Sequence, residues 1–248
     1  MEKDIEVNHV NFAYGQTRIL QNIDFYLSKG DFAAVIGANG TGKSTLLRLL
    51  TGELTPDRGN VRLLGEDVRQ FKRWPKIGYV PQNIIATAAR FPATAEEVIC
   101  ANMYSQIGLF RLPGSKHKQK AREALAQVGM EAYARRPIDR LSGGQQQRVM
   151  IARVLAADPE VMILDEPTTG IDSQTTEEIY RILSALNEQQ RLTILIVTHD
   201  VTKALHQVSR MLCLEAGTLV ELDSQQIHDE LMHKHRHPQI AQRIDLLE

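Results

Sequence analysis

The sequence has little cysteine, no excess of charge of either sign and no long apolar run. Its two cysteines among 248 residues, Cys100 and Cys213, lie far apart and form no Cys-x-x-Cys pair. This argues against a disulfide framework and fits a reducing compartment. The formal net charge of −1 provides no overall basic field of the kind that attracts nucleic acid, so no nucleic-acid partner is expected.

Two further absences concern membranes. No apolar run approaches the roughly 18 residues of a transmembrane helix, so any membrane spans are expected to come from another chain. Residues Met1–Glu6 show no apolar segment behind a basic start, so no signal peptide is expected. The composition, with 43% apolar and 24% charged residues and no internal repeat, is typical of a globular protein. The length of 248 residues allows one large domain or two modest ones.

The apolar pattern predicts an α/β fold. Alternating apolar and polar residues near the N-terminus, at about 5–10 and 23–27, are typical of a half-exposed antiparallel sheet. Continuous apolar runs predict buried parallel strands at 31–36, 162–164 and 193–197. Shorter strands are expected at 61–64 and 77–80. Helices are expected at about 116–129, 144–157 and 174–189. We expect a catalytic core at about 1–83 and 141–225, an inserted helical subdomain at about 84–140 and a histidine-containing tail at about 226–248.

The stretch Gly37-Ala-Asn-Gly-Thr-Gly-Lys-Ser44 matches the P-loop pattern and lies between an expected strand and an expected helix. Gly40 and Gly42 allow backbone N–H groups to turn inward, and these groups form an anion site with the helix N-terminus. Lys43 is expected to reach the β- and γ-phosphates of ATP, and the Ser44 hydroxyl to bind Mg²⁺. The candidate nucleotide-binding residues here are Gly37, Asn39, Gly40, Thr41, Gly42, Lys43, Ser44 and Thr45.

The apolar run Val161-Met-Ile-Leu-Asp-Glu166 ends in two carboxylates and has the form of a Walker B motif. Asp165 is expected in the Mg²⁺ shell, and Glu166 is expected to orient or deprotonate the attacking water. A buried strand followed by acidic turn residues is the structural alternative. The P-loop upstream favours the catalytic interpretation.

The pentapeptide Leu141-Ser-Gly-Gly-Gln145 leads directly into an expected helix. Ser142 is a natural N-cap, and Gly143 and Gly144 leave backbone N–H groups bare at the helix N-terminus, which is a second anion site. With the other two motifs it resembles the signature sequence of ABC-type ATPases, the ATP-binding subunits of ABC transporters. The resemblance covers nearly the whole chain and implies their P-loop fold. It also implies that Ser142, Gly143, Gly144 and Gln145 dock on the γ-phosphate held by a second copy.

The resemblance assigns roles to four more residues. Tyr14 matches the aromatic residue that stacks on adenine, and Asp172 matches the D-loop aspartate, although Gly170-Ile171 replaces the commoner Ala-Leu before it. Gln82 matches the Q-loop residue that touches Mg²⁺ and the water, and His199 matches the switch histidine that contacts the γ-phosphate. The structural alternatives are a tyrosine at a strand end and a hydrogen-bonded histidine after a buried strand.

The same resemblance implies ATP hydrolysis with Mg²⁺ in a dimer at the cytoplasmic face of a membrane. The implied partners are polytopic permease subunits and an extracytoplasmic solute-binding protein that acts through them. Stretches such as Ile77–Gln82 and Phe91–Thr94 are similar to those of zinc and manganese importers, so import of zinc or manganese is expected. Import of iron complexes, haem or another solute stays open. A non-transport ABC ATPase of DNA repair or translation also stays open, although such proteins usually carry long coiled-coil insertions or two ATPase units.

The C-terminal tail contains His228 and the run His233-Lys-His-Arg-His237. Three imidazoles at every second position lie on one side of an extended chain and could bind Zn²⁺. A solvated basic tail is the alternative, because Lys234 and Arg236 would repel a cation and no acidic or cysteine ligand nearby completes a tetrahedral set.

Overall fold

The computed structural model describes residues 2–82, 92–103, 112–223 and 226–227. The chain forms two compact units, the first from Met1–Lys72 and Asn187–Glu248 and the second from Arg73–Leu186. Among the residues that the structure describes, no helix is both long and apolar enough to cross a bilayer.

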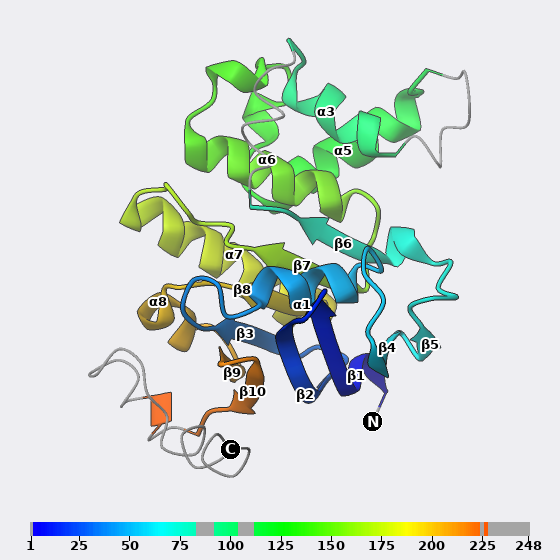
Figure 1. Ribbon diagram of the computed structural model, residues 1–248. Coiled ribbons are helices and arrows are strands. Elements are labelled where there is room, and N and C mark those ends of the chain that lie inside the picture. Colours follow the sequence, from blue (N-terminus) through cyan, green and yellow to red (C-terminus); the bar gives the residue numbers. More distant parts are fainter. Residues whose placement is uncertain (1, 83–91, 104–111, 224–225, 228–248) are drawn as a thin grey trace. The chain divides into compact units, whose positions relative to one another are not determined.

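The first unit contains an antiparallel sheet in the order β2-β1-β4-β5 (Figure 1). Its strands are β1 (Lys3–Tyr14), β2 (Thr17–Ser28), β4 (Arg58–Leu63) and β5 (Glu66–Asp67). Val7 of β1 pairs with Phe25 of β2 and with Val61 of β4, and all three side chains are buried. Polar positions between them are partly or fully exposed, so the alternation in the sequence corresponds to one buried face. The expected antiparallel layer is confirmed.

The first unit also contains a mostly parallel sheet whose central strands are fully buried. Strand order is β10-β9-β3-β8, with β3 (Phe32–Ile36), β8 (Thr193–Val197), β9 (Arg210–Glu215) and β10 (Thr218–Glu221). Strand β3 pairs in parallel with β8 and β9, and every residue of β3 and β8 is buried, which explains their continuous apolar runs. Helix α1 (Lys43–Leu50) follows β3 and helix α8 (Val201–Leu205) follows β8. Strands β9 and β10 and helix α8 were not predicted from the sequence.

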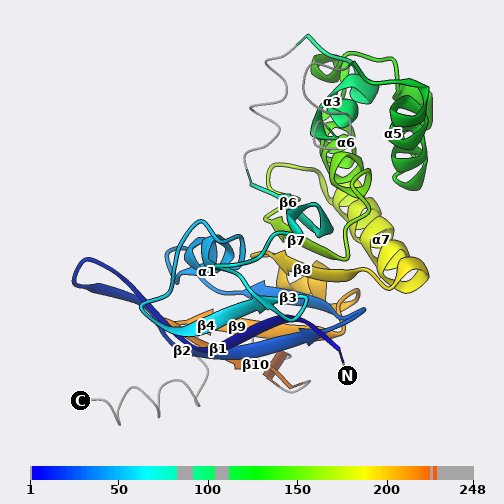
Figure 2. The same cartoon turned by 90° about the vertical axis from the view of Figure 1, so that its right-hand side faces the viewer.

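The two sheets of the first unit lie against each other. Figure 2 shows β1 and β2 beside β9 and β10, and the Gln21 N–H donates to the Gly217 carbonyl at 2.7 Å where the layers meet. A buried hydrogen bond joins them at another point, because the Thr193 hydroxyl donates to Asp4. Both of these side chains are almost entirely shielded from solvent, so the bond forms in a low-dielectric interior.

The second unit combines two parallel strands with helices. The strands are β6 (Ile77–Val80) and β7 (Val161–Asp165). The helices are α3 (Ala95–Asn102), α5 (Ser115–Gln127), α6 (Gly143–Leu155) and α7 (Ser173–Gln190). Short 3₁₀ turns are η1 (Trp74–Lys76), η2 (Glu131–Tyr133) and η3 (Ile138–Arg140). The end of α7, from Asn187, belongs to the first unit. The three long helices expected from the sequence, α5, α6 and α7, are confirmed. Helix α3 lies within the predicted helical subdomain but was not predicted as a separate helix.

Helices α3, α5 and α6 pack together (Figure 1). A capping box begins α3, because the Thr94 side chain accepts from the Glu97 N–H and the Glu97 side chain accepts from the Thr94 N–H. Arg122 of α5 donates to Glu96 of α3 at 2.6 Å, and Asn102 of α3 donates to a carbonyl of α6 at 3.0 Å. These bonds supplement the apolar packing and fix the helices in one arrangement.

Candidate nucleotide site

The P-loop connects β3 to α1, and two of its glycines are required by the backbone. Gly37 has φ 151°, and a Cβ atom at this residue would lie 2.2 Å from the Leu214 carbonyl oxygen. Gly42 is the N-cap of α1, with φ 106° in the left-handed region. No side chain caps α1, so its first N–H groups are available to an anion. The predicted strand–loop–helix context is confirmed.

Lys43 is the first residue of α1 and is only 6% exposed. Its Nζ atom donates to the Gly37 carbonyl at 2.8 Å and to the Ala38 carbonyl at 2.9 Å. Loop carbonyls therefore hold the ammonium group over the loop, where phosphate oxygens are able to replace them as acceptors. Ser44 is exposed at the start of the helix, whereas Thr45 is buried.

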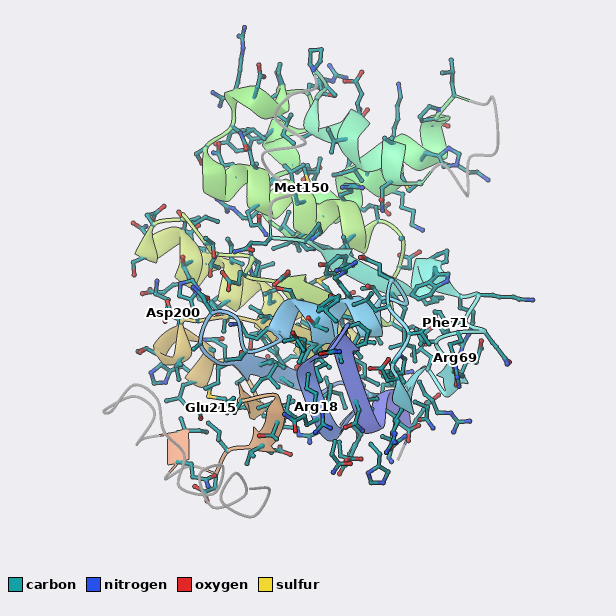
Figure 3. All side chains as sticks on the ribbon, viewed as in Figure 1. Arg18, Arg69, Phe71, Met150, Asp200 and Glu215 are labelled. Atoms are coloured by element: carbon teal, nitrogen blue, oxygen red, sulfur yellow. The ribbon has the colours of Figure 1, made fainter. Side chains whose placement is uncertain are left out.

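His199 leaves the sheet at the same edge as the P-loop. Strands β3 and β8 are parallel neighbours, with Val35 paired to Val197, so Gly37 and His199 each come two residues after this pair. The Thr198 N–H donates to the Val35 carbonyl at 3.1 Å and extends the pairing toward His199. His199 itself is exposed, and Asp200 beside it caps α8 by accepting from the Lys203 N–H (Figure 3). The fold thus brings two predicted site elements together.

Tyr14 ends β1 and is 45% exposed as a residue. Phe12 packs against it in an edge-to-face arrangement, with 4.9 Å between ring centroids, and Arg48 of α1 donates to its hydroxyl at 3.1 Å. The ring is therefore held in place while part of its surface stays open. An ordered, partly exposed aromatic ring suits stacking on a flat base.

In the second unit, the register of two parallel strands brings Gln82 and Glu166 together, as that of β3 and β8 does for the P-loop and His199. Strands β6 and β7 are parallel, with Val80 paired to Leu164, so each polar residue follows the pair by two positions. The Gln82 Nε2 atom donates to Glu166 Oε2 at 2.9 Å. Asp165 precedes Glu166 at the end of β7 and is 8% exposed. The fold thus joins a predicted Q-loop residue to the predicted catalytic carboxylate, 84 positions apart in the sequence.

Ser142 caps α6 as predicted. Its hydroxyl accepts from the Gln145 N–H at 3.3 Å, and the Gln145 side chain accepts from the Ser142 N–H at 3.0 Å. This capping box occupies the Gln145 N–H and leaves those of Gly143 and Gly144 for an external acceptor. Gly143 is exposed, and Gly144 is buried.

The predicted D-loop aspartate also has a local structural role. Asp172 Oδ1 accepts from the Thr175 N–H at 2.9 Å at the start of α7, and this bond holds the pKa of the Asp172 carboxyl below its usual range. The Thr175 methyl group in turn faces the backbone of Gly144, because a Cβ atom added there would come within 2.1 Å of it. The signature helix therefore touches the first turn of α7, which Asp172 precedes, within one chain.

The comparison with protein families agrees with these motifs. The family described as "ABC transporter" matches residues 20–169, which include the P-loop, Gln82, the signature sequence and Glu166. The chain belongs to the ABC transporter ATPase family. Such ATPases hydrolyse ATP to power transport, so this chain is an ATPase.

Individual ABC proteins are similar over most of the chain. The "Zinc uptake system ATP-binding protein ZurA" of Listeria monocytogenes is 39% identical over 247 residues, covering 100% of this chain and 93% of the relative. The "Manganese transport system ATP-binding protein MntB" of Bacillus subtilis is 36% identical, covering 81% and 78%. The dimeric ATP-binding cassette MJ0796, solved with ADP and phosphate, has a TM-score of 0.72 and 30% identity, covering 89% of this chain and 99% of that one.

Three threonines of this ABC ATPase that the sequence did not indicate contact or adjoin the predicted site residues. Thr169 donates its hydroxyl to Glu166, Thr175 contacts Gly144, and the Thr198 N–H joins the end of β8 to Val35 of β3, two residues before the P-loop. The spacing of Thr169, three residues after the acidic Glu166 in an expected turn, could have indicated its hydrogen bond to Glu166. Nothing in the sequence pointed to the Thr175 contact.

A metal-binding tail remains a prediction. His228 and the histidines of residues 233–237 lie outside the described residues, as does Phe91. Within the described part of the chain, no group of three or more His, Cys, Asp or Glu side chains is placed to hold a metal ion.

Proposed function

We propose that this ABC ATPase powers the import of zinc or manganese through separate permease subunits at the cytoplasmic face of a membrane. The observation that carries the metal assignment is the similarity to a zinc uptake ATP-binding protein over the whole chain. The manganese relative, at 36% identity over 200 residues, keeps the second metal as an equal candidate. An extracytoplasmic solute-binding protein is proposed to deliver the metal to the permease.

We assign the chemistry to in-line attack of water on the γ-phosphorus of ATP. Lys43 and the P-loop N–H groups offset negative charge on the phosphate oxygens, and His199 contacts the γ-phosphate. Support for the pairing of these elements comes from the shared sheet edge of β3 and β8. Glu166 orients the water and takes its proton. Tyr14 stacks on the adenine.

The donor set suits Mg²⁺. Ser44 offers a hydroxyl oxygen, Asp165 a carboxylate and Gln82 an amide oxygen, and Mg²⁺ prefers such hard oxygen ligands. Asp165 is only 8% exposed, so a bound cation would interact with its carboxylate in a partly desolvated environment. When bound, Mg²⁺ neutralises charge on the β- and γ-phosphates.

We further propose that hydrolysis requires two copies of the chain. The N–H groups that the capping box of α6 leaves available form an anion site, and in the proposed dimer this site completes the P-loop of the partner. The dimeric state of MJ0796 with ADP and phosphate supports this arrangement. We place Asp172 in the same proposed interface, and its bond to Thr175, which contacts Gly144 of the signature region, supports this.

The assigned roles are tested with two variants. Glu166→Gln removes the proton acceptor but keeps the shape of the side chain, so we expect ATP binding to remain and phosphate release to fall by about 10²-fold or more. Lys43→Ala removes the charge that faces the phosphates, so we expect weaker ATP binding by calorimetry. Wild-type phosphate release by Glu166→Gln would refute the role of Glu166. A wild-type affinity of Lys43→Ala would refute that of Lys43.

The transported solute is tested through the membrane subunit. Affinity purification of the chain from native membranes is expected to yield a polytopic permease. That complex, reconstituted in vesicles, is expected to take up radioactive zinc or manganese only with ATP and not with the Glu166→Gln variant. Uptake of an iron complex or haem in place of either metal would show that the ATPase role is right and the metal assignment wrong.

A further inference from the structure

Glu166 occupies an unusual backbone conformation immediately after β7. Its φ is 45°, in the left-handed region that residues other than glycine seldom adopt. The chain turns sharply here, because the Thr169 N–H donates to the Glu166 carbonyl at 3.2 Å. The turn therefore places the Thr169 side chain next to Glu166.

Two side chains donate to the same carboxylate oxygen. The Thr169 hydroxyl reaches Glu166 Oε2 at 3.0 Å, and the Gln82 amide reaches it at 2.9 Å. The two donors come from different elements, since Gln82 follows β6 and Thr169 belongs to the turn after β7. Two bonds to one oxygen restrict rotation of the carboxylate about its last carbon–carbon bond and so fix the direction of the other oxygen.

The two donors differ in how firmly they are tied to Glu166. Thr169 is three residues away within a hydrogen-bonded turn, so its hydroxyl stays near the carboxylate for as long as the turn persists. Gln82 is also assigned to Mg²⁺ and the water in the proposed function, so its amide has a second role during the reaction. Of these two donors, Thr169 is therefore the one that stays with the carboxylate when Gln82 changes partners.

We propose that Thr169 is a positioning residue for ATP hydrolysis, whose hydroxyl holds the Glu166 carboxylate in the orientation in which it takes a proton from the attacking water. The inference rests on the proposed role of Glu166. It predicts that Thr169 acts on turnover and not on nucleotide binding, because it touches Glu166 and belongs to neither the P-loop nor the signature sequence.

The test compares Thr169→Val with Thr169→Ser in a phosphate-release assay on the full chain with MgATP. Valine keeps the shape and removes the hydroxyl, so we expect kcat to fall about tenfold or more while KM for ATP stays within about twofold. Serine keeps the hydroxyl, so we expect it to retain most of the activity. Thr168→Val is the matched control, because it makes the same change one residue earlier in the turn and is expected to leave kcat unchanged.

The outcomes separate this inference from the proposed function. If Glu166→Gln is inactive and Thr169→Val has the wild-type kcat, the positioning role is wrong and the role of Glu166 stands. A raised KM with an unchanged kcat would also overturn it, since Thr169 would then contribute to binding. If Glu166→Gln keeps wild-type turnover, both proposals fail. Should Thr169→Val melt at a lower temperature than wild type, Thr169→Ala and Thr169→Ser are compared at a temperature where each is folded, with the same two criteria.

Discussion

Gly144 in the signature sequence has no room for a side chain, for a reason that does not involve nucleotide. A Cβ atom at this residue would lie 2.1 Å from Cγ2 of Thr175, against 3.4–4 Å for ordinary contact. The Thr175 Cβ atom would be 3.2 Å away as well. Gly143, one residue earlier in α6, has no such neighbour within 4 Å. The pair offers a matched comparison of the same substitution.

The expected magnitude follows from two opposing effects. Alanine is better than glycine in a helix by up to about 1 kcal/mol, and this gain applies to both Gly143→Ala and Gly144→Ala. Only Gly144→Ala also meets Thr175, whose β-branched side chain has few alternative rotamers, and such overpacking typically costs about 1–3 kcal/mol. We therefore expect Gly144→Ala to be less stable than Gly143→Ala by about 1–3 kcal/mol.

The assay is unfolding of the nucleotide-free protein, followed by far-ultraviolet circular dichroism in urea and on heating. For a protein of this size, about 1 kcal/mol corresponds to a change of about 2–4 °C in Tm. Thr175→Ser removes the methyl group that makes the 2.1 Å contact and keeps the backbone N–H bonded to Asp172. Adding it to Gly144→Ala is expected to recover at least about 1 kcal/mol, as a double-mutant cycle measures it.

Two results would refute this reasoning. Equal stability of Gly143→Ala and Gly144→Ala would mean that the contact with Thr175 relaxes without cost. A destabilised Gly144→Ala that Thr175→Ser does not rescue would place the cause elsewhere. Either result would leave the proposed docking of the signature sequence on nucleotide untouched, because the measurement contains no nucleotide.

Two further predictions concern stability. Thr193→Val removes the hydroxyl that donates to the buried Asp4 carboxylate, so urea unfolding should show a loss of about 1–3 kcal/mol, and an unchanged midpoint would contradict it. A side-chain hydrogen bond from Arg69 lowers the pKa of Asp67 from 3.8 to about 2, so its stabilising contribution is complete above pH 3.8 and is lost as the pH falls to about 2. Asp67→Asn should therefore be less stable than wild type at neutral pH, and this difference should be largely lost by about pH 2. A difference in unfolding free energy that stays constant over this range would refute the assignment.

Elements whose signal is local were predictable from the sequence. The P-loop strand and helix, the buried strands β7 and β8 and the Ser142 cap are confirmed, because each depends on apolar periodicity or on a residue type at a fixed offset from a helix start. Strands β9 and β10 were missed. Strand β10 is only partly buried, and its short mixed pattern carries little periodicity.

The sequence by itself determined which residue types are available for ATP chemistry, since the motifs are contiguous and their loops are built from local glycines and caps. Only the tertiary structure decided which of them meet. The Gln82 bond to Glu166 and the position of His199 beside the P-loop depend on the register of parallel strands that are distant in the chain. The contact between Gly144 and Thr175 depends on how two helices pack. Pairing register and packing are set by the whole core at once, so no short stretch of sequence encodes them.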